Sequence, residues 1–185
     1  NADKSTLYKI NYTSRVIIRV LAPLFKFKCH SPEILYKQAK KIDWEDFLSL
    51  GKTFAVFATV SNSKITHSKY AALRLKDAIV DCFRYRHNER PNVDTNNPDV
   101  WFSLRVENNK AVINMDTSGG SLHRRGYRKE MVSAPMQETL ASAIIKFSNW
   151  NGNTPLYDPM CGSGTILMEA LMQYCNMPSK KKKKN

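Results

Sequence analysis

The chain has 185 residues, of which 42% are hydrophobic and 24% charged, and its formal net charge is +13. This balance is typical of a folded globular protein and excludes a disordered one. No apolar run approaches the eighteen or so residues that a membrane span needs. The opening "NADKSTLYKINY" contains no apolar stretch of a secretory signal. It also lacks an initiator Met, so we expect the natural start to be missing.

The positive charge is the strongest bulk signal. Five lysines form the run Lys180–Lys184 near the end, which we expect to be a solvated linker or loop. The excess that remains suits a polyanionic partner such as nucleic acid, and solubility alone is the other explanation. The four cysteines are far apart and include no C-x-x-C pair. This indicates free thiols in a reducing compartment, the cytoplasm, without a structural metal site.

The first half of the chain alternates between helix and strand signals. Residues 15–28 begin with β-branched side chains and break at Pro23. The stretch 31–42 predicts a helix with Ser31 as its N-cap, and 53–60 predicts a strand rich in β-branched and aromatic residues. Residues 68–87 predict an amphipathic helix. Its expected apolar stripe consists of Ala72, Leu75, Ile79 and Cys82.

The next elements complete a first domain. Residues 90–99 are rich in turn formers, and 100–116 predict a β-hairpin around the polar four-residue turn "ENNK". Up to residue 116 the alternation favours a small α+β domain. Further on, a helix is expected from Pro135, a short strand end over 156–158 and a helix over 166–174, as at the opening of an α/β domain. Leu140, Ile144 and Phe147 should share one side of the helix that begins at Pro135.

The loop "DPMCGSGT", Asp158 to Thr165, carries the clearest chemical signal. A phosphate-binding loop would need a Lys after its second glycine, and none is present. A dinucleotide fingerprint would need a third glycine where Leu167 stands. The third candidate ligand is S-adenosylmethionine. Its amino acid part can approach the backbone of glycines, and its ammonium group can pair with a carboxylate. A tight strand–helix turn without a ligand is the alternative.

Five motifs in order resemble one family. "RLKDAIVDCF", "RPNVD", "LHRRGYR", "APMQETLASAI" and "DPMCGSGT" are similar to segments of the THUMP-domain RNA methyltransferases. The similarity runs from about Tyr36 to Tyr174 and is strongest to bacterial members that methylate a guanine N2 of large-subunit ribosomal RNA. It implies an α+β fold: a THUMP-type RNA-binding domain at 1–118, a basic connector at 119–133, and at 134–185 the start of a Rossmann-like S-adenosylmethionine-dependent methyltransferase domain.

The resemblance also implies site residues. The donor-binding candidates are Ser133, Ala134, Pro135, Glu138 and Thr139 ahead of the loop, and Asp158, Pro159, Cys161, Gly162, Ser163, Gly164 and Thr165 within it. Basic and aromatic residues are the candidates for RNA contact. These are Lys69, Arg74, Lys76, Arg84, Tyr85, Arg86, Arg90, Arg124, Arg125 and Arg128. For the connector arginines, pairing with acidic groups at a domain interface is the alternative.

A later motif of such enzymes, Asn or Asp before Pro-Pro and an aromatic, is missing from the sequence. We therefore expect an incomplete enzyme that has no catalytic side chain and is inactive alone. We also expect it to be a monomer that binds ribosomal RNA and does not bind a membrane. Its last fifty residues should be poorly stable by themselves. Two other functions stay open: a non-enzymatic RNA-binding module that keeps the loop, and an adenine-N6 methyltransferase.

Overall fold

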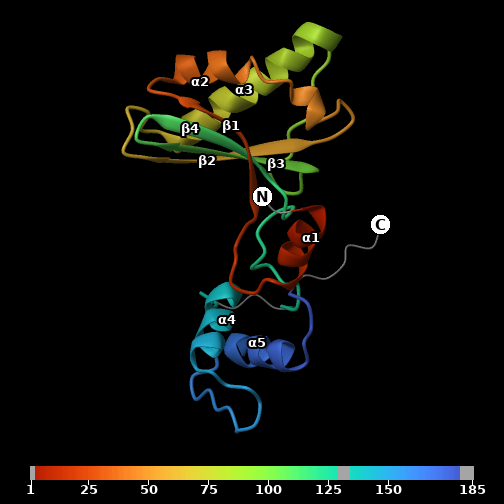
Figure 1. Cartoon of the computed structure of the whole chain (residues 1–185), viewed down its shortest axis with the longest axis vertical. Coiled ribbons are helices and arrows are strands. Elements are labelled where there is room, and N and C mark those ends of the chain that lie inside the picture. Colours follow the sequence, from red (N-terminus) through yellow and green to blue (C-terminus); the bar gives the residue numbers. More distant parts are fainter. Residues whose placement is uncertain (1–2, 129–133, 180–185) are drawn as a thin grey trace. The chain divides into compact units, whose positions relative to one another are not determined.

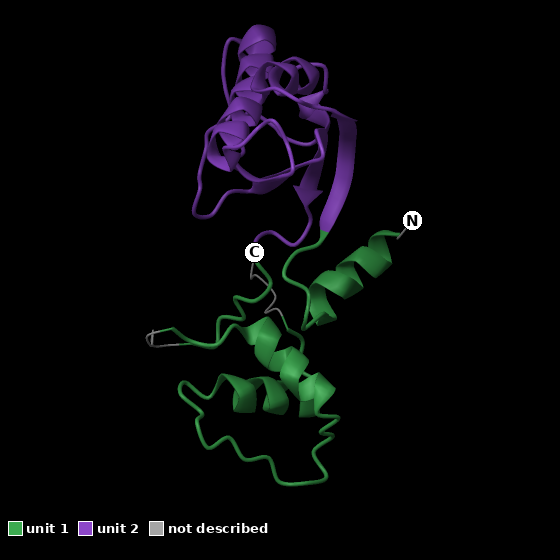
Figure 2. Ribbon diagram, turned by 90° about the vertical axis from the view of Figure 1, so that its left-hand side faces the viewer, with its two compact units in different colours: residues 1–20, 121–185 green, residues 21–120 purple. Residues whose placement is uncertain are grey.

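The computed structural model describes residues 3–128 and 134–179 and divides into two compact units (Figure 2). One unit is residues 21–120, and the other joins residues 1–20 to 121–185. The elements of the first are β1 (Leu21–Lys28), α2 (Pro32–Ala39), the 3-10 helix η1 (Trp44–Asp46), β2 (Phe54–Ser61), α3 (Ser68–His87), β3 (Val100–Glu107) and β4 (Lys110–Asp116). Those of the second are α1 (Lys4–Thr13), α4 (Glu138–Phe147) and α5 (Thr165–Tyr174). Within the described ranges no helix is both long and apolar enough to cross a membrane.

The unit of residues 21–120 is a four-stranded sheet with two helices on one face. The strand order is β1-β4-β3-β2. β2 and β3 pair in parallel, whereas β4 pairs antiparallel with both β3 and β1. Parallel neighbours need a crossover, and α3 supplies it between β2 and β3. α2 and α3 lie beside each other over the same face of the sheet (Figure 1), as the α+β prediction requires.

The core of this unit lies between the sheet and its helices. Trp44 and Phe102 pack edge to face with ring centroids 5.2 Å apart, and the Trp44 indole N–H donates to the Ala39 carbonyl at 2.9 Å. Aromatic residues bury the largest apolar areas. Alternate residues of the strands, such as Leu104 and Val106, fill the rest of the cluster.

Most local predictions for this unit are confirmed. Ser31 caps α2 by accepting from the Ile34 N–H at 3.3 Å, and α3 spans the predicted 68–87. The apolar stripe of α3 is wider than predicted, because the helix packs against α2 as well as the sheet. Ala72 and Cys82 are only half-buried, whereas the fully covered residues are Ala71, Leu75, Ala78, Ile79, Val80 and Phe83.

Two turn predictions need correction. The chain does not break at Pro23, since β1 runs through it with a shift of register between Pro23 and Phe25. A proline is tolerated there because β1 is an edge strand. The hairpin turn has two residues and not four: Asn108 and Asn109 both have positive φ, 50° and 58°, which is the type I′ turn that suits the strand twist.

In the other unit α5 matches the helix predicted at 166–174 to within one residue, whereas α4 begins later and faces differently from the prediction. α4 starts at Glu138 and not at Pro135. Its predicted apolar side is exposed: Leu140, Ile144 and Phe147 are 53%, 39% and 87% accessible. The opposite side, Ala141, Ser142 and Ile145, is buried instead. The strand predicted at 156–158 does not form, because a strand needs a neighbour to pair with and the described part of this unit offers none.

Residues 1–20 belong to the same unit as residues 121–185, which we call the C-terminal unit. The prediction had assigned residues 1–20 to the first domain at 1–118. The reason is a set of long-range contacts. The Arg15 guanidinium donates to the carbonyls of Met172, at 2.9 Å, and Met177, and the Ile18 carbonyl accepts from the Leu122 N–H at 2.8 Å. The unit boundary therefore falls near residue 20.

Candidate functional site

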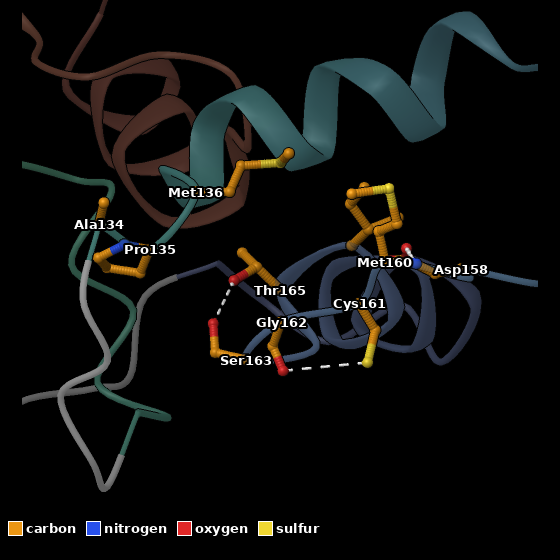
Figure 3. Close-up of a pocket in the computed structure, with 10 residues that line it drawn as sticks. Ala134, Pro135, Met136, Asp158, Met160, Cys161, Gly162, Ser163 and Thr165 are labelled. Carbon is orange, nitrogen blue, oxygen red and sulfur yellow. Dashed lines mark hydrogen bonds between the residues drawn. The ribbon is translucent and has the colours of Figure 1, made fainter.

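A cavity of about 240 Å³ lies in the C-terminal unit, between two segments that are distant in the sequence (Figure 3). One wall is made by Ala134, Pro135 and Met136, just ahead of α4. The other wall is the loop from Asp158 to Ile166 that leads into α5. The sequence predicted these two segments as donor-binding candidates, and the structure brings them together around one hollow.

The glycines of the loop give it its course. Gly162 and Gly164 have φ values of 52° and 70°, a region that costs other residues about 1–2 kcal/mol. The Gly164 N–H donates to the Cys161 carbonyl at 2.7 Å and closes the turn. A Cβ atom added at either glycine would meet nothing within 4 Å. Glycine is required for the backbone angle, and the space over the loop is open.

The loop ends at the N-terminus of α5. Gly164 is the N-cap, and no side chain caps the first turn of this helix. The first N–H groups of a helix lack partners within the helix and attract anions. Asp158 stands at the other end of the loop, where its Oδ1 accepts from the Met160 N–H at 3.2 Å. The site thus offers backbone donors for a carboxylate and a carboxylate for a cation.

Arg128 joins the two walls of the cavity. Its Nη2 donates to the Met136 carbonyl at 2.6 Å and to the Thr165 hydroxyl at 3.0 Å. The same nitrogen lies 3.6 Å from Oε1 of Glu138, a residue that is only 6% exposed. The Thr165 hydroxyl in turn lies 3.1 Å from the Ser163 hydroxyl (Figure 3). One guanidinium therefore fixes the spacing between the two segments.

A buried ionic cluster lies beneath the loop, on α5. Glu169 is fully buried. Its carboxylate accepts from Arg125 Nε at 3.4 Å, from the Tyr127 hydroxyl at 3.3 Å and from the Ser142 hydroxyl, and Arg15 Nη1 lies 3.7 Å away. Burial and the nearby carboxylate raise the pKa of Tyr127, so this phenol stays protonated and donates. Buried charges are stable only when paired in this way.

The predicted donor-binding residues fall into three groups. Those that line the cavity are Ala134, Pro135, Asp158, Cys161, Gly162, Ser163 and Thr165. Those that do not line it are Pro159, Gly164, Glu138 and Thr139, of which the last two are buried. Ser133 lies outside the described residues. Met136, Met160 and Ile166 line the cavity and were not predicted, although the first two belong to the motifs that drew attention to the walls.

The predicted RNA contacts in the connector have other partners. Arg125 is 4% exposed and is bonded to Glu169 and to the Leu122 carbonyl at 2.7 Å. Arg128 bridges the cavity walls. Both arginines therefore pair with acidic groups, Arg125 with Glu169 and Arg128 with Glu138. This was the alternative to RNA contact, but the pairs lie within one unit and not at a domain interface. Arg124 is exposed.

The cations of α3 are also compensated. Arg86 lies 2.7 Å from Asp43 and 3.2 Å from Glu45, and Arg74 lies over the Tyr36 ring at 4.5 Å. The remaining ion pairs are Arg74–Asp77, Lys76–Asp77 and Arg84–Asp81. Among the other candidates, Lys69 and Arg90 are exposed and form no ion pair within the described ranges, and Tyr85 is an exposed aromatic residue. Ion pairs therefore offset part of the positive charge of α3, and the helix keeps a net positive charge.

Comparison with known families matches both units. Residues 29–116 match the THUMP domain, and residues 125–185 match the RMKL-like methyltransferase domain. The second match includes Arg125 and Arg128 of the connector, α4, the glycine loop and α5. The order of the two domains is the order that the five sequence motifs indicated.

Individual relatives agree. The chain is 43% identical to "Putative RNA methyltransferase slr0064" of Synechocystis sp., over 95% of this chain and 46% of that protein. It is 44% identical to the Ribosomal RNA large subunit methyltransferase K/L of Syntrophotalea carbinolica, over 90% of this chain and 24% of the relative. The solved structure of SMU.472 complexed with SAH superposes with a TM-score of 0.79 at 32% identity, covering 96% of this chain and 47% of that one. The chain thus spans half or less of these relatives.

Proposed function

We propose that this chain, which belongs to the family that joins a THUMP domain to an RMKL-like methyltransferase domain, holds the methyl donor of an RNA methyltransferase in the cavity between residues 134–136 and 158–166. The donor is S-adenosylmethionine, and the substrate is a guanine N2 of large-subunit ribosomal RNA. The THUMP domain, residues 29–116, binds that RNA.

The convergence of the two predicted segments on one cavity carries the proposal. Seven of the residues chosen from sequence motifs line this hollow, although more than twenty residues separate Pro135 from Asp158. A turn without a ligand, the alternative interpretation, gives no reason for a second distant motif to face it. The structure of SMU.472 with bound SAH supports the same ligand class.

The chemistry of the walls fits such a donor. S-adenosylmethionine presents a carboxylate, an ammonium group, a sulfonium and an adenosine. The uncapped N-terminus of α5 would receive the carboxylate, and the Asp158 carboxylate would pair with the ammonium group. Met136, Met160 and Cys161 supply polarizable apolar surface. The bound donor would supply an electrophilic methyl group.

The role of these residues is to bind and orient. Methyl transfer depends on alignment of the reacting atoms more than on acid–base help, so no titrating catalyst is required from this part of the chain. The guanine N2 and the large ribosomal subunit are inferred from the motif resemblance and from relatives named Ribosomal RNA large subunit methyltransferase K/L. The monomeric state and the cytoplasmic location expected from the sequence remain part of the proposal.

Calorimetric titration of the chain with S-adenosylmethionine and with S-adenosylhomocysteine tests the donor site. Asp158→Ala should weaken both affinities by about tenfold, the loss of about 1.4 kcal/mol that one charged contact typically supplies. Asp46→Ala, which removes an exposed carboxylate from the other unit, should change neither. Equal affinities of the wild-type and Asp158→Ala chains for the donor would exclude this loop as the donor site. The absence of donor binding by the wild-type chain would exclude the cavity.

A further inference from the structure

We propose that a basic surface around the β3–β4 turn, and not the cationic face of α3, binds the phosphate backbone of the RNA. This turn surface consists of Lys26, Lys28, His30, Lys64, Arg105 and Lys110, all exposed residues of the THUMP unit. The inference rests on the proposed function for the identity of the polyanion. It adds the surface that receives it.

Two hollows flank the turn. The larger, of about 550 Å³, contains Lys26, Arg105 and Lys110, and the smaller, of about 330 Å³, contains Lys28, His30, Lys64 and again Lys110. Asn108 lines both hollows, so they meet at the turn. The cations come from three segments of the chain and line two adjacent hollows.

The side chain and carbonyl of Asn109 hold these segments together. Its carbonyl accepts from the Cys29 N–H at 2.7 Å, which fixes the end of β1. Its Oδ1 accepts from the Lys64 N–H at 2.9 Å and from the Ser63 hydroxyl at 3.2 Å, which fixes the loop before α3. The backbones that carry the lysines are thus ordered before any ligand arrives, which reduces the entropic cost of binding.

Most of the charge of the turn surface, that of its four lysines, is without an ion-pair partner among the described residues. Glu107 is the only carboxylate among the described residues that line the two hollows, and it pairs with Arg105 at 2.9 Å. Within the described ranges none of the four lysines forms an ion pair. On α3, by contrast, four of the five Lys and Arg side chains lie in ion pairs, with Asp77 and Asp81 of the helix and with Asp43 and Glu45 outside it. Release of counterions from phosphates favours the face whose cations are free.

The pairing of the strands points the same way. Lys28 of β1 stands directly opposite Lys110 of β4 in the antiparallel register. Like charges at such positions destabilise a sheet. On its other side Lys110 stands opposite Glu107 of β3, which offsets part of this repulsion, and an anion bound beside the two ammonium groups would offset the rest.

The lining of the hollows also limits what is recognised. No Phe, Tyr or Trp is present among the described residues that line them, so stacking on bases is not provided. Lysines act as point charges toward phosphate and carry no sequence information. The surface should position RNA without regard to sequence, leaving the choice of base to the rest of the enzyme.

The test measures the affinity of the chain for a labelled, unmodified fragment of large-subunit ribosomal RNA by fluorescence anisotropy over a series of salt concentrations, without methyl donor. The variant is Lys28→Gln with Lys110→Gln. Since each lost phosphate contact flattens the plot of log affinity against log salt by about 0.7 for single strands, the slope should fall by about 1.4. The matched control, Lys37→Gln with Lys41→Gln, removes two exposed lysines at α2 and should keep the wild-type slope.

A second readout separates binding from folding. Because the change removes both the like-charge pair of Lys28 with Lys110 and the opposite-charge pair of Lys110 with Glu107, the unfolding midpoint of the Lys28/Lys110 variant at low salt should stay close to that of the wild type. Three results would overturn the proposal: equal loss in both double variants, which indicates diffuse attraction by net charge; competition by polyglutamate as strong as by RNA; and no RNA binding by the wild-type chain. Donor binding is measured separately, so these failures leave the donor site standing.

Discussion

Replacement of Glu169 by Gln should open the C-terminal unit while leaving the THUMP unit folded. The carboxylate is fully buried and lies 3.4 Å from Arg125. At an effective dielectric constant of about 20, a charge pair at this distance interacts by about 5 kcal/mol. Gln keeps the shape but removes the charge, so the buried guanidinium of Arg125 is left uncompensated, and breaking a buried pair in this way costs about 3–5 kcal/mol.

Hydrogen exchange read by mass spectrometry reports each unit separately. A loss of about 3–5 kcal/mol should speed exchange in peptides from α4 and α5 by about two to four orders of magnitude. Peptides from β3 and β4, whose residues belong to the main apolar cluster, should be unchanged. Glu89→Gln, a change at an exposed position, is the matched control. Exchange in α4 and α5 within threefold of the wild type would refute the structural role given to this ionic cluster.

Two further predictions concern the donor cavity and the thiols. Arg128→Ala removes the nitrogen that contacts both walls, so calorimetry should show S-adenosylmethionine affinity lowered by about tenfold; unaltered affinity would show that the bridge does not set the cavity. Burial raises the pKa of the Cys29 thiol to about 11, so this thiol is protonated at any pH well below that value and should resist alkylation. Cys161 and Cys175 are exposed and should react, and donor should protect Cys161 alone, as peptide mapping can show. Labelling of Cys29 as fast as that of Cys175 would contradict the burial of the Cys29 thiol. Equal protection of Cys161 and Cys175 by the donor would contradict the place of Cys161 in the donor cavity.

The THUMP unit was largely predictable because its local signals agree with its buried faces. Ser31 and Pro32 mark the start of α2, and the apolar period of 68–87 marks α3. Each of these helices is covered by an element nearby in the sequence or by the sheet. The pair Asn108–Asn109 is a common signal for a type I′ turn, so the shorter turn was also readable.

The C-terminal unit was less predictable because its contacts are long-range. Apolar spacing favoured Leu140, Ile144 and Phe147 as the inner side of α4, yet the helix buries Ser142 against Glu169. The partner is 27 residues away, and periodicity does not reveal such a bond. The same holds for Arg125, whose acidic partner is 44 residues away.

The two glycines of the loop have a local physical reason that a sequence can reveal. Gly162 and Gly164 are demanded by backbone angles, and such requirements are visible in a sequence. The prediction that the segment before α4 faces the loop was based on the family resemblance. The chemistry of its residues did not indicate it. Arg128, which ties the two together, carried no signal that separated it from a surface cation.

The most direct measurement uses the natural protein that carries these residues. It is incubated with labelled S-adenosylmethionine and unmodified large-subunit ribosomal RNA, the RNA is digested, and the labelled nucleoside is identified by mass spectrometry. We predict N2-methylguanosine, lost in the Asp158→Ala variant. A labelled methyladenosine would contradict the proposed base, and the absence of label in a protein that binds the RNA would contradict methyl transfer itself.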